Sequence, residues 1–276
     1  MSDLPLRLLT GALLIALVIV VLFASPLWLF ALVTIGFIGV GLNEFFALVS
    51  RKGILIERWI GLGIGLMIPL SIYWEFEPTK GWELFFMVVA LLALFILQLR
   101  RQDSSHAIVG ISTALFGIFY VSWLFSFLIK LRLTSSPAIP DGRWSVAFLL
   151  LVTKGGDVGA YTVGSVFGKH ALARRISPSK TWEGSLGGLL FSLGLACLLK
   201  PAFPQIPLGH LLTLALFLGI FGQLGDLSES LIKRDCQVKD SGRLLPGMGG
   251  VLDVLDSLLF TAPLCYFYIR KFFMGY

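Results

Sequence analysis

Two aspartates, Asp253 and Asp256, stand three residues apart at the head of a strongly apolar segment. In an α-helix this spacing places both carboxylates on one face. Ionisable groups inside membrane helices are costly and are usually functional. Carboxylate oxygens suit Mg²⁺, which also takes phosphate oxygens and water. The pair therefore predicts a magnesium and phosphate site. Capping of the helix N-terminus by Asp253 is an alternative, but it explains only one of the two residues.

Four polar residues share one predicted helical face just upstream, at positions i, i+3, i+4 and i+7: Asp226, Glu229, Ser230 and Lys233. Asp226 could join the aspartate pair as a third carboxylate ligand for one Mg²⁺ ion, or for two. Glu229 and Lys233 could instead form a plain ion pair along one helix. Both interpretations of Glu229 remain open from the sequence.

The segment 233–250, between these two groups, is rich in cations and glycines. Lys233-Arg234 and Lys239-Asp240 bracket a polar turn, and Pro246-Gly-Met-Gly-Gly250 follows. Glycines expose backbone N–H groups and let an anion come close. A helix beginning near residue 251 would direct its positive end to the same place. The segment thus predicts phosphate binding, with a basic cytoplasmic loop that turns at Gly and Pro as the alternative.

A third polar region covers residues 154–184. Asp157 interrupts an apolar segment among glycines, and we expect it to face the interior of a helix bundle. The run Ser177-Pro-Ser-Lys180-Thr181 is typical of a helix entry and could cap a helix or bind a phosphate. Glu44, in an early apolar segment, is a weaker candidate, because snorkelling to the interface or pairing between helices explains it better than chemistry.

The composition predicts an all-α fold, a polytopic transmembrane helical bundle. The chain has 276 residues, of which 57% are hydrophobic and 14% are charged, whereas soluble domains average about 25% charged residues. A span needs about 20 mostly apolar residues. We expect about nine spans: 8–24, 27–48, 59–75, 82–99, 107–129, 144–165, 184–200, 207–232 and 251–270.

We expect one integral-membrane domain over 1–276, with apolar scaffold spans in 1–143 and the catalytic spans and loops in 144–276. If the N-terminus is cytoplasmic, fourteen of the 22 Lys and Arg residues fall on the cytoplasmic side and seven outside, with Lys154 inside a span. This bias favours a site facing the cytoplasm. No basic tract with interleaved aromatics suggests nucleic-acid binding, and no cysteine or histidine spacing suggests zinc.

Together these motifs resemble the phosphatidate cytidylyltransferase (CDP-diacylglycerol synthase) family. The resemblance covers about residues 150–260 and includes Asp157–Tyr161 and Ile176–Gly184. Met248 stands where the family pattern has His, and Val254 where it often has Arg. The longest match keeps unbroken spacing from Ser230 to Asp256 through Lys233, Arg234, Lys239, Asp240, Leu245, Pro246, Gly249, Gly250 and Asp253.

The resemblance implies transfer of a cytidylyl group from CTP to phosphatidic acid in the bilayer, by a Mg²⁺-dependent enzyme of a bacterial-type inner membrane, with a homodimer as the oligomer. It implies catalytic roles for Lys233, Lys239 and Asp240, and metal binding by Asp226, Asp253 and Asp256. The residues it implies for substrate binding are Asp157, Ser177, Lys180, Thr181, Ser230, Arg234, Gly249 and Gly250.

Three alternatives compete with this hypothesis. An ion- or proton-coupled transporter would use intramembrane carboxylates near the middle of the bilayer and would show repeat symmetry. A CTP-dependent transferase or kinase could act on another lipid. A family member without activity could serve as a scaffold, given Met248 and Val254.

Overall fold

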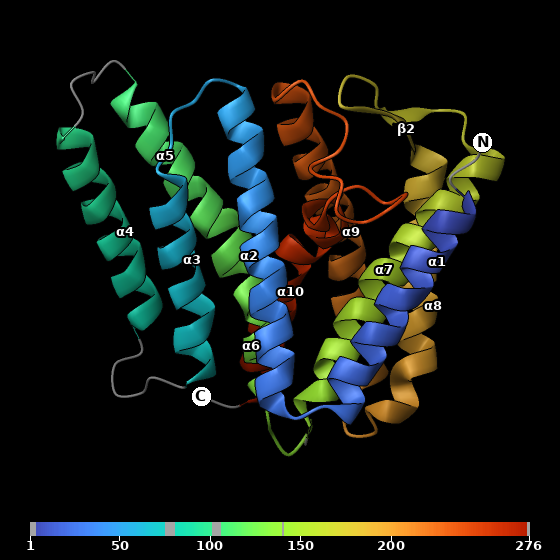
Figure 1. Cartoon of the computed structure of the whole chain (residues 1–276). Coiled ribbons are helices and arrows are strands. Elements are labelled where there is room, and N and C mark those ends of the chain that lie inside the picture. The colour runs from blue at the N-terminus through green and yellow to red at the C-terminus, as the bar shows by residue number, and fades with distance from the viewer. Residues whose placement is uncertain (1–3, 75–80, 101–105, 140, 275–276) are drawn as a thin grey trace. The chain divides into compact units, whose positions relative to one another are not determined.

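The computed structural model describes residues 4–74, 81–100, 106–139 and 141–274 (Figure 1). About four fifths of this part of the chain is helical, which confirms the expected all-α class. The α-helices are α1 (Leu4–Ile19), α2 (Leu27–Arg51), α3 (Arg58–Tyr73), α4 (Trp82–Leu99), α5 (Ala107–Gly117), α6 (Leu124–Leu133), α7 (Gly142–Phe167), α8 (Trp182–Leu199), α9 (Leu208–Asp235) and α10 (Val251–Phe273).

Eight helical segments among the described residues are long and apolar enough to cross a membrane. One of them runs from Ala107 to Leu133, because the π-helical turn Ile118–Trp123 joins α5 to α6. The remaining expected span, 59–75, corresponds to α3, which has only 16 residues. Its expected last residue, 75, lies outside the described residues. The polytopic bundle is therefore confirmed, with eight long helices and one short one.

The chain forms two compact units. Unit 1 consists of Met1–Ile129 and Cys236–Leu255, and unit 2 consists of Lys130–Asp235 and Asp256–Tyr276. The division thus falls inside α10. The predicted separation into a scaffold up to residue 143 and a working part after it stays a prediction, because a grouping by contacts does not say which helices carry chemistry.

Small residues let the helices of unit 1 pack closely, and α2, α3 and α5 lie side by side (Figure 1). A Cβ atom on Gly65 of α3 would lie 2.5 Å from a methyl carbon of Leu42 in α2. Phe45 and Phe46 of α2 are almost fully buried, and their rings meet edge to face. These contacts form an apolar core on one side of α2.

The carboxylate of Glu44 joins α2 to the first turn of α10. Glu44 is buried, and its Oε1 accepts a hydrogen bond from the Val251 backbone N at 3.1 Å. Its Oε2 accepts from the Leu252 backbone N at 2.9 Å and from the Ser241 hydroxyl at 3.3 Å. The first N–H groups of a helix have no partner within the helix, and they carry its positive end. Glu44 therefore pairs helices, as expected.

In unit 2, α7, α8 and α9 pack against one another. The Ser192 hydroxyl of α8 donates to the carbonyl of Val152 in α7 at 3.0 Å. A short antiparallel hairpin, β1 (Ala171–Ala173) and β2 (Ser177–Thr181), connects α7 to α8. It belongs to the same unit as the helices it connects.

The hairpin was not predicted, because the hydroxyls and the proline of β2 are typical of a helix entry. Within the hairpin the Trp182 backbone N donates to the His170 carbonyl at 2.9 Å, which holds the two strands together at their open end. The helix entry itself is confirmed at Thr181, whose Oγ1 accepts from the Gly184 backbone N at 3.1 Å and caps α8.

Replacing Glu44 with alanine should strongly destabilise the protein. The change leaves buried backbone N–H groups at Val251 and Leu252 without acceptors, at a cost of about 1–3 kcal/mol for each. Thermal unfolding of the purified variant should show a clearly lowered midpoint. Glu44→Gln keeps one acceptor oxygen and should give a smaller loss. An unchanged midpoint for Glu44→Ala would contradict the anchoring role.

Candidate functional site

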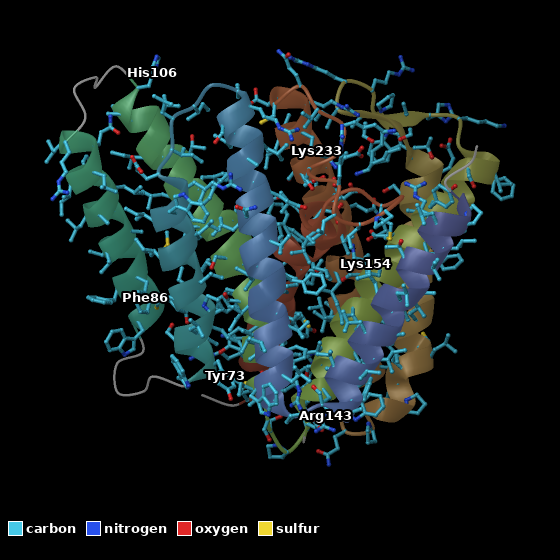
Figure 2. The ribbon with its side chains drawn as sticks, viewed as in Figure 1. Tyr73, Phe86, His106, Arg143, Lys154 and Lys233 are labelled. Atoms are coloured by element: carbon cyan, nitrogen blue, oxygen red, sulfur yellow. The ribbon has the colours of Figure 1, made fainter. Side chains whose placement is uncertain are left out.

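A polar cluster surrounds Lys154 in the apolar helix α7, near the middle of that helix (Figure 2). Its Nζ lies 3.2 Å from Oδ2 of Asp157, 3.4 Å from Oδ1 of Asp256 and 2.7 Å from Oγ of Ser257. The Ser257 hydroxyl donates in turn to Asp157 Oδ2 at 2.9 Å. These four residues, the Lys154 cluster, link α7 to α10 through charge-assisted hydrogen bonds.

Close packing of α9 against α10 determines the position of Asp256 in this cluster. A Cβ atom on Gly225 of α9 would lie 2.6 Å from the backbone oxygen of Asp256 in α10, so glycine is needed for the two helices to touch there. Asp226 follows Gly225 directly along α9 and lines a cavity together with Asp157, which shares Lys154 with Asp256. The structure thus brings together Asp226, Asp256 and Asp157, three of the predicted site residues.

Lys180 extends from β2 to Asp226, with 2.5 Å between Nζ and Oδ2. Both residues line a cavity of about 440 Å³ in unit 2, together with Asp157, Thr181 and Gln223. Lys180 and the carboxylates of Asp157 and Asp226 therefore share one cavity wall. Such a wall suits a ligand that carries both phosphate groups and a bound cation.

Three other predicted site residues, Ser230, Lys233 and Arg234, lie near the C-terminal end of α9. Lys233 forms an ion pair with Glu229, whose carboxylate is 1% exposed. This is the plain pair along one helix that the sequence left open. Ser230, the residue after Glu229, is half-buried. Arg234 Nε donates to the carbonyl of Ile176 at 3.1 Å, next to Ser177, and so ties α9 to the hairpin.

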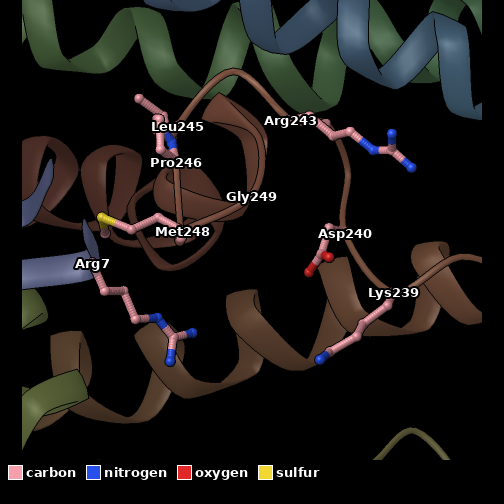
Figure 3. Close-up of a pocket in the computed structure, with 10 residues that line it drawn as sticks. Arg7, Lys239, Asp240, Arg243, Leu245, Pro246, Met248 and Gly249 are labelled. Atoms are coloured by element: carbon pink, nitrogen blue, oxygen red, sulfur yellow. The ribbon is translucent and has the colours of Figure 1, made fainter. Parts of the chain in front are cut away.

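In unit 1, the loop before α10 borders a second cavity, of about 580 Å³ (Figure 3). Lys239 and Asp240 line it, as does Arg7 of α1. The loop closes on itself because the Leu245 backbone N donates to the Gly249 carbonyl at 2.9 Å. Gly249 has a φ of 98°, which other residues rarely adopt.

Donors of the loop before α10 hold the carboxylate of Asp253. Its Oδ2 accepts from the Ser241 backbone N at 2.9 Å, the Ser241 hydroxyl at 2.8 Å and the Gly250 backbone N at 2.7 Å. Gly250 directly precedes the first residue of α10, so the last contact is a helix cap. A Cβ on Gly249 would lie 2.5 Å from Asp253 Oδ2. The capping alternative is therefore confirmed for Asp253.

The two glycines have a packing role that the sequence did not reveal. A Cβ on Gly250 would lie 2.5 Å from Oε2 of Glu44. Gly249 and Gly250 thus make room for two carboxylates, those of Asp253 and Glu44. Their predicted contact with substrate stays a prediction.

The predicted metal ligands are suitable in kind, but they do not form one group in this structure. Among the residues that it describes, no three His, Cys, Asp or Glu side chains form an arrangement that could hold a metal ion. Asp256 pairs with Lys154, and Asp226 pairs with Lys180. Their oxygens remain the ligand type that Mg²⁺ prefers. The three-carboxylate magnesium site therefore stays a prediction.

Three residues that lie among the site residues in the structure, Lys154, Ser257 and Arg7, were not predicted from the sequence. Lys154 had a visible signal, since a lone lysine inside an apolar span needs a partner. Ser257 had none, because serines are common in membrane helices. Arg7 also had none, because a basic residue near the start of a membrane helix is ordinary.

The sequence and this geometry fit a known class of membrane enzymes. The chain belongs to the cytidylyltransferase family, whose profile matches residues 5–272. It is 36% identical over 266 residues to the phosphatidate cytidylyltransferase of Synechocystis sp., with 88% of each chain covered. It is 34% identical to the enzyme of the same name from Bacillus subtilis, with 99% of this chain and 100% of the relative covered. A chloroplastic relative from Arabidopsis thaliana, phosphatidate cytidylyltransferase 4, is 32% identical over 88% of this chain and 68% of its own.

Replacing Lys154 with methionine should destabilise the protein, because it removes the cation that pairs with Asp256, whose side chain is only 11% exposed. The Lys154 side chain is 35% exposed, so the expected loss is about 1–3 kcal/mol, below the values for fully buried pairs. The double variant Lys154→Met/Asp256→Asn should lose less than the two single variants together.

Thermal unfolding of the four proteins in this cycle measures the effect. Lys169→Met is a matched control, because Lys169 is exposed at the start of the hairpin. Additive losses in the cycle would show that Lys154 and Asp256 do not interact.

Proposed function

We propose that this chain transfers the cytidylyl group of CTP to phosphatidic acid, giving CDP-diacylglycerol and pyrophosphate. The names of its relatives support this activity, and so does its membership of the cytidylyltransferase family. The observation that carries the proposal is the Lys154 cluster. Four polar side chains meet inside apolar helices, where such groups are costly and mark functional sites.

The reaction is a displacement at phosphorus. A phosphate oxygen of phosphatidic acid attacks the α-phosphorus of CTP, and a new P–O bond forms there. The bond from that phosphorus to the β-phosphate breaks, and pyrophosphate leaves with its electrons. The attacking oxygen is already anionic, so no strong general base is needed. The main barrier is the approach of two anions, which positioning and positive charge lower.

The residues of the Lys154 cluster and the cavity beside it fit this requirement. Lys180 brings positive charge to the cavity wall that also carries Asp157 and Asp226, and Lys154 brings it to Asp157 and Asp256. Thr181 and the neighbouring Ser177 could donate hydrogen bonds to phosphate oxygens, as the sequence predicts. Their backbone is held in place by the hairpin. In this proposal these residues bind and orient phosphate groups.

Magnesium dependence belongs to the same proposal. Asp226 and Asp256 are the residues of unit 2 that would hold Mg²⁺, with Asp253 as the third ligand that the sequence predicts. A bound ion would neutralise charge on the phosphates. Asp253 has a capping role as well, so its effect on activity should include a loss of stability.

The chain is a membrane protein. The excess of Lys and Arg in the loops of one side supports a site that faces the cytoplasm. CTP is present on that side, while phosphatidic acid reaches the same protein through the bilayer. This orientation and the homodimer that the resemblance implies are parts of the proposal, as is a bacterial-type inner membrane.

Purified protein incubated with Mg²⁺, labelled CTP and phosphatidic acid should form CDP-diacylglycerol and pyrophosphate in equal amounts. Asp256→Asn and Asp226→Asn should each lower this rate about 100-fold or more, since each removes a charged group from the phosphate site. Chelating Mg²⁺ with EDTA should stop the reaction, and added Mg²⁺ should restore it.

Asp235→Asn is the control, because it removes an exposed carboxylate from the end of the same helix as Asp226. Thermal unfolding separates loss of activity from loss of fold. If varied lipids and cations give neither product, the transferase proposal fails. A CTP-dependent product on another lipid would favour a different acceptor.

A further inference from the structure

We infer that Arg7, at the start of the N-terminal helix α1, binds the phosphate groups of the nucleoside triphosphate. This inference rests on the proposed function and adds a specificity residue from the end of the chain farthest from the sequence motif. Arg7 lines the cavity of unit 1 with Lys239, Asp240 and Met248 (Figure 3). The side chains of Arg7 and Lys239 point into the same space, whereas Arg243 points away (Figure 3).

The start of α1 is seated on the loop by two contacts. The Thr10 hydroxyl donates to the carbonyl of Pro246 at 3.0 Å. A Cβ atom on Gly247 would lie 3.1 Å from the backbone N of Arg7, and Gly247 has a φ of 75°. Glycine at this position thus allows both the turn and the close approach of α1. The position of the Arg7 backbone is therefore set by the same loop that carries Lys239.

The cations that line this cavity carry positive charge that no carboxylate among the described residues neutralises by an ion pair. In the part of the chain that the structure describes, Arg7, Lys239 and Arg243 form no ion pair with any carboxylate. Asp240 contributes one negative charge to the lining, against the two positive charges of Arg7 and Lys239 that point into the cavity. Cations gathered around a cavity, without partners, attract an anion. A guanidinium in addition can bind two phosphate oxygens at once.

The lining favours a polyphosphate over a lipid. The cavity holds about 580 Å³, and charged side chains and backbone of a glycine-rich turn form most of its wall. Met248 offers no hydrogen-bond donor to a phosphate. Arg7 supplies such donors in the same cavity, from a different part of the chain. The chemistry that fits best is the phosphate chain shared by CTP and pyrophosphate.

The test uses the full-length enzyme in detergent with phosphatidic acid and Mg²⁺. Arg7→Gln should raise the KM for CTP about tenfold, which corresponds to the loss of one charge-assisted hydrogen bond. The inhibition constant of pyrophosphate should rise by a similar factor, because pyrophosphate carries only the phosphate groups. Inhibition by cytidine, which lacks phosphates, should not change. Arg7→Lys should give an intermediate KM for CTP.

Two further measurements isolate the charge. Arg51→Gln removes an exposed arginine at the end of α2 that does not line the cavity, and its KM for CTP should equal that of the unchanged protein. The thermal unfolding midpoint of Arg7→Gln should also be unchanged, which separates phosphate binding from the seating of α1.

Some outcomes would overturn the inference. An unchanged KM for CTP in an active Arg7→Gln enzyme would do so, and so would a rise in the KM for phosphatidic acid instead. A similar rise for cytidine inhibition would point to a general distortion and would also refute it. The proposed function has a separate failure: the unchanged protein would then form no CDP-lipid at all.

Discussion

The arrangement of unit 1 depends on the hydrogen bonds between the buried carboxylate of Glu44 and the start of α10. It accepts hydrogen bonds from the first two N–H groups of α10 and from the hydroxyl of Ser241. Such N–H groups have no partner within their own helix, and burying one without an acceptor costs about 1–3 kcal/mol. Glu44 therefore determines where α10 begins. The start of α10 in turn places Asp253 and the glycine-rich loop before it.

The same constraint explains the polar residues of unit 2. A carboxylate within an apolar helix needs a cation or hydrogen-bond donors, because water is scarce around it. Asp256 of α10 forms an ion pair with Lys154 of α7, and Asp226 of α9 forms one with Lys180 of β2. Each pair joins two separate elements, so the groups that could contact phosphates also fix the packing around them. This dual role makes stability and activity sensitive to the same residues.

The sequence could predict the features that depend on neighbouring residues. Spanning helices follow from apolar runs, the Thr181 cap lies three residues before its donor, and Glu229 pairs with Lys233 four residues on. It could not predict contacts between distant positions. Lys154 and Asp256 are 102 positions apart and Glu44 and Val251 are 207 apart, and no periodicity connects them. The β-hairpin was missed for a different reason, because its residues also suit a helix entry.

Asp253 and Asp256, which first suggested a metal site, have different roles although they lie close together on one face of the same helix. Residues three apart on a helix have Cβ atoms about 5–6 Å apart. Asp253 is nevertheless within the first turn of α10, where the loop supplies N–H donors from Ser241 and Gly250. Asp256 is one turn farther on, beyond those donors. Besides its neighbour Ser257, it takes its partner from another helix, namely Lys154. In the proposed reaction, a metal ion at Asp256 would take the place of Lys154, whereas at Asp253 it would have to displace three hydrogen-bond donors of the loop.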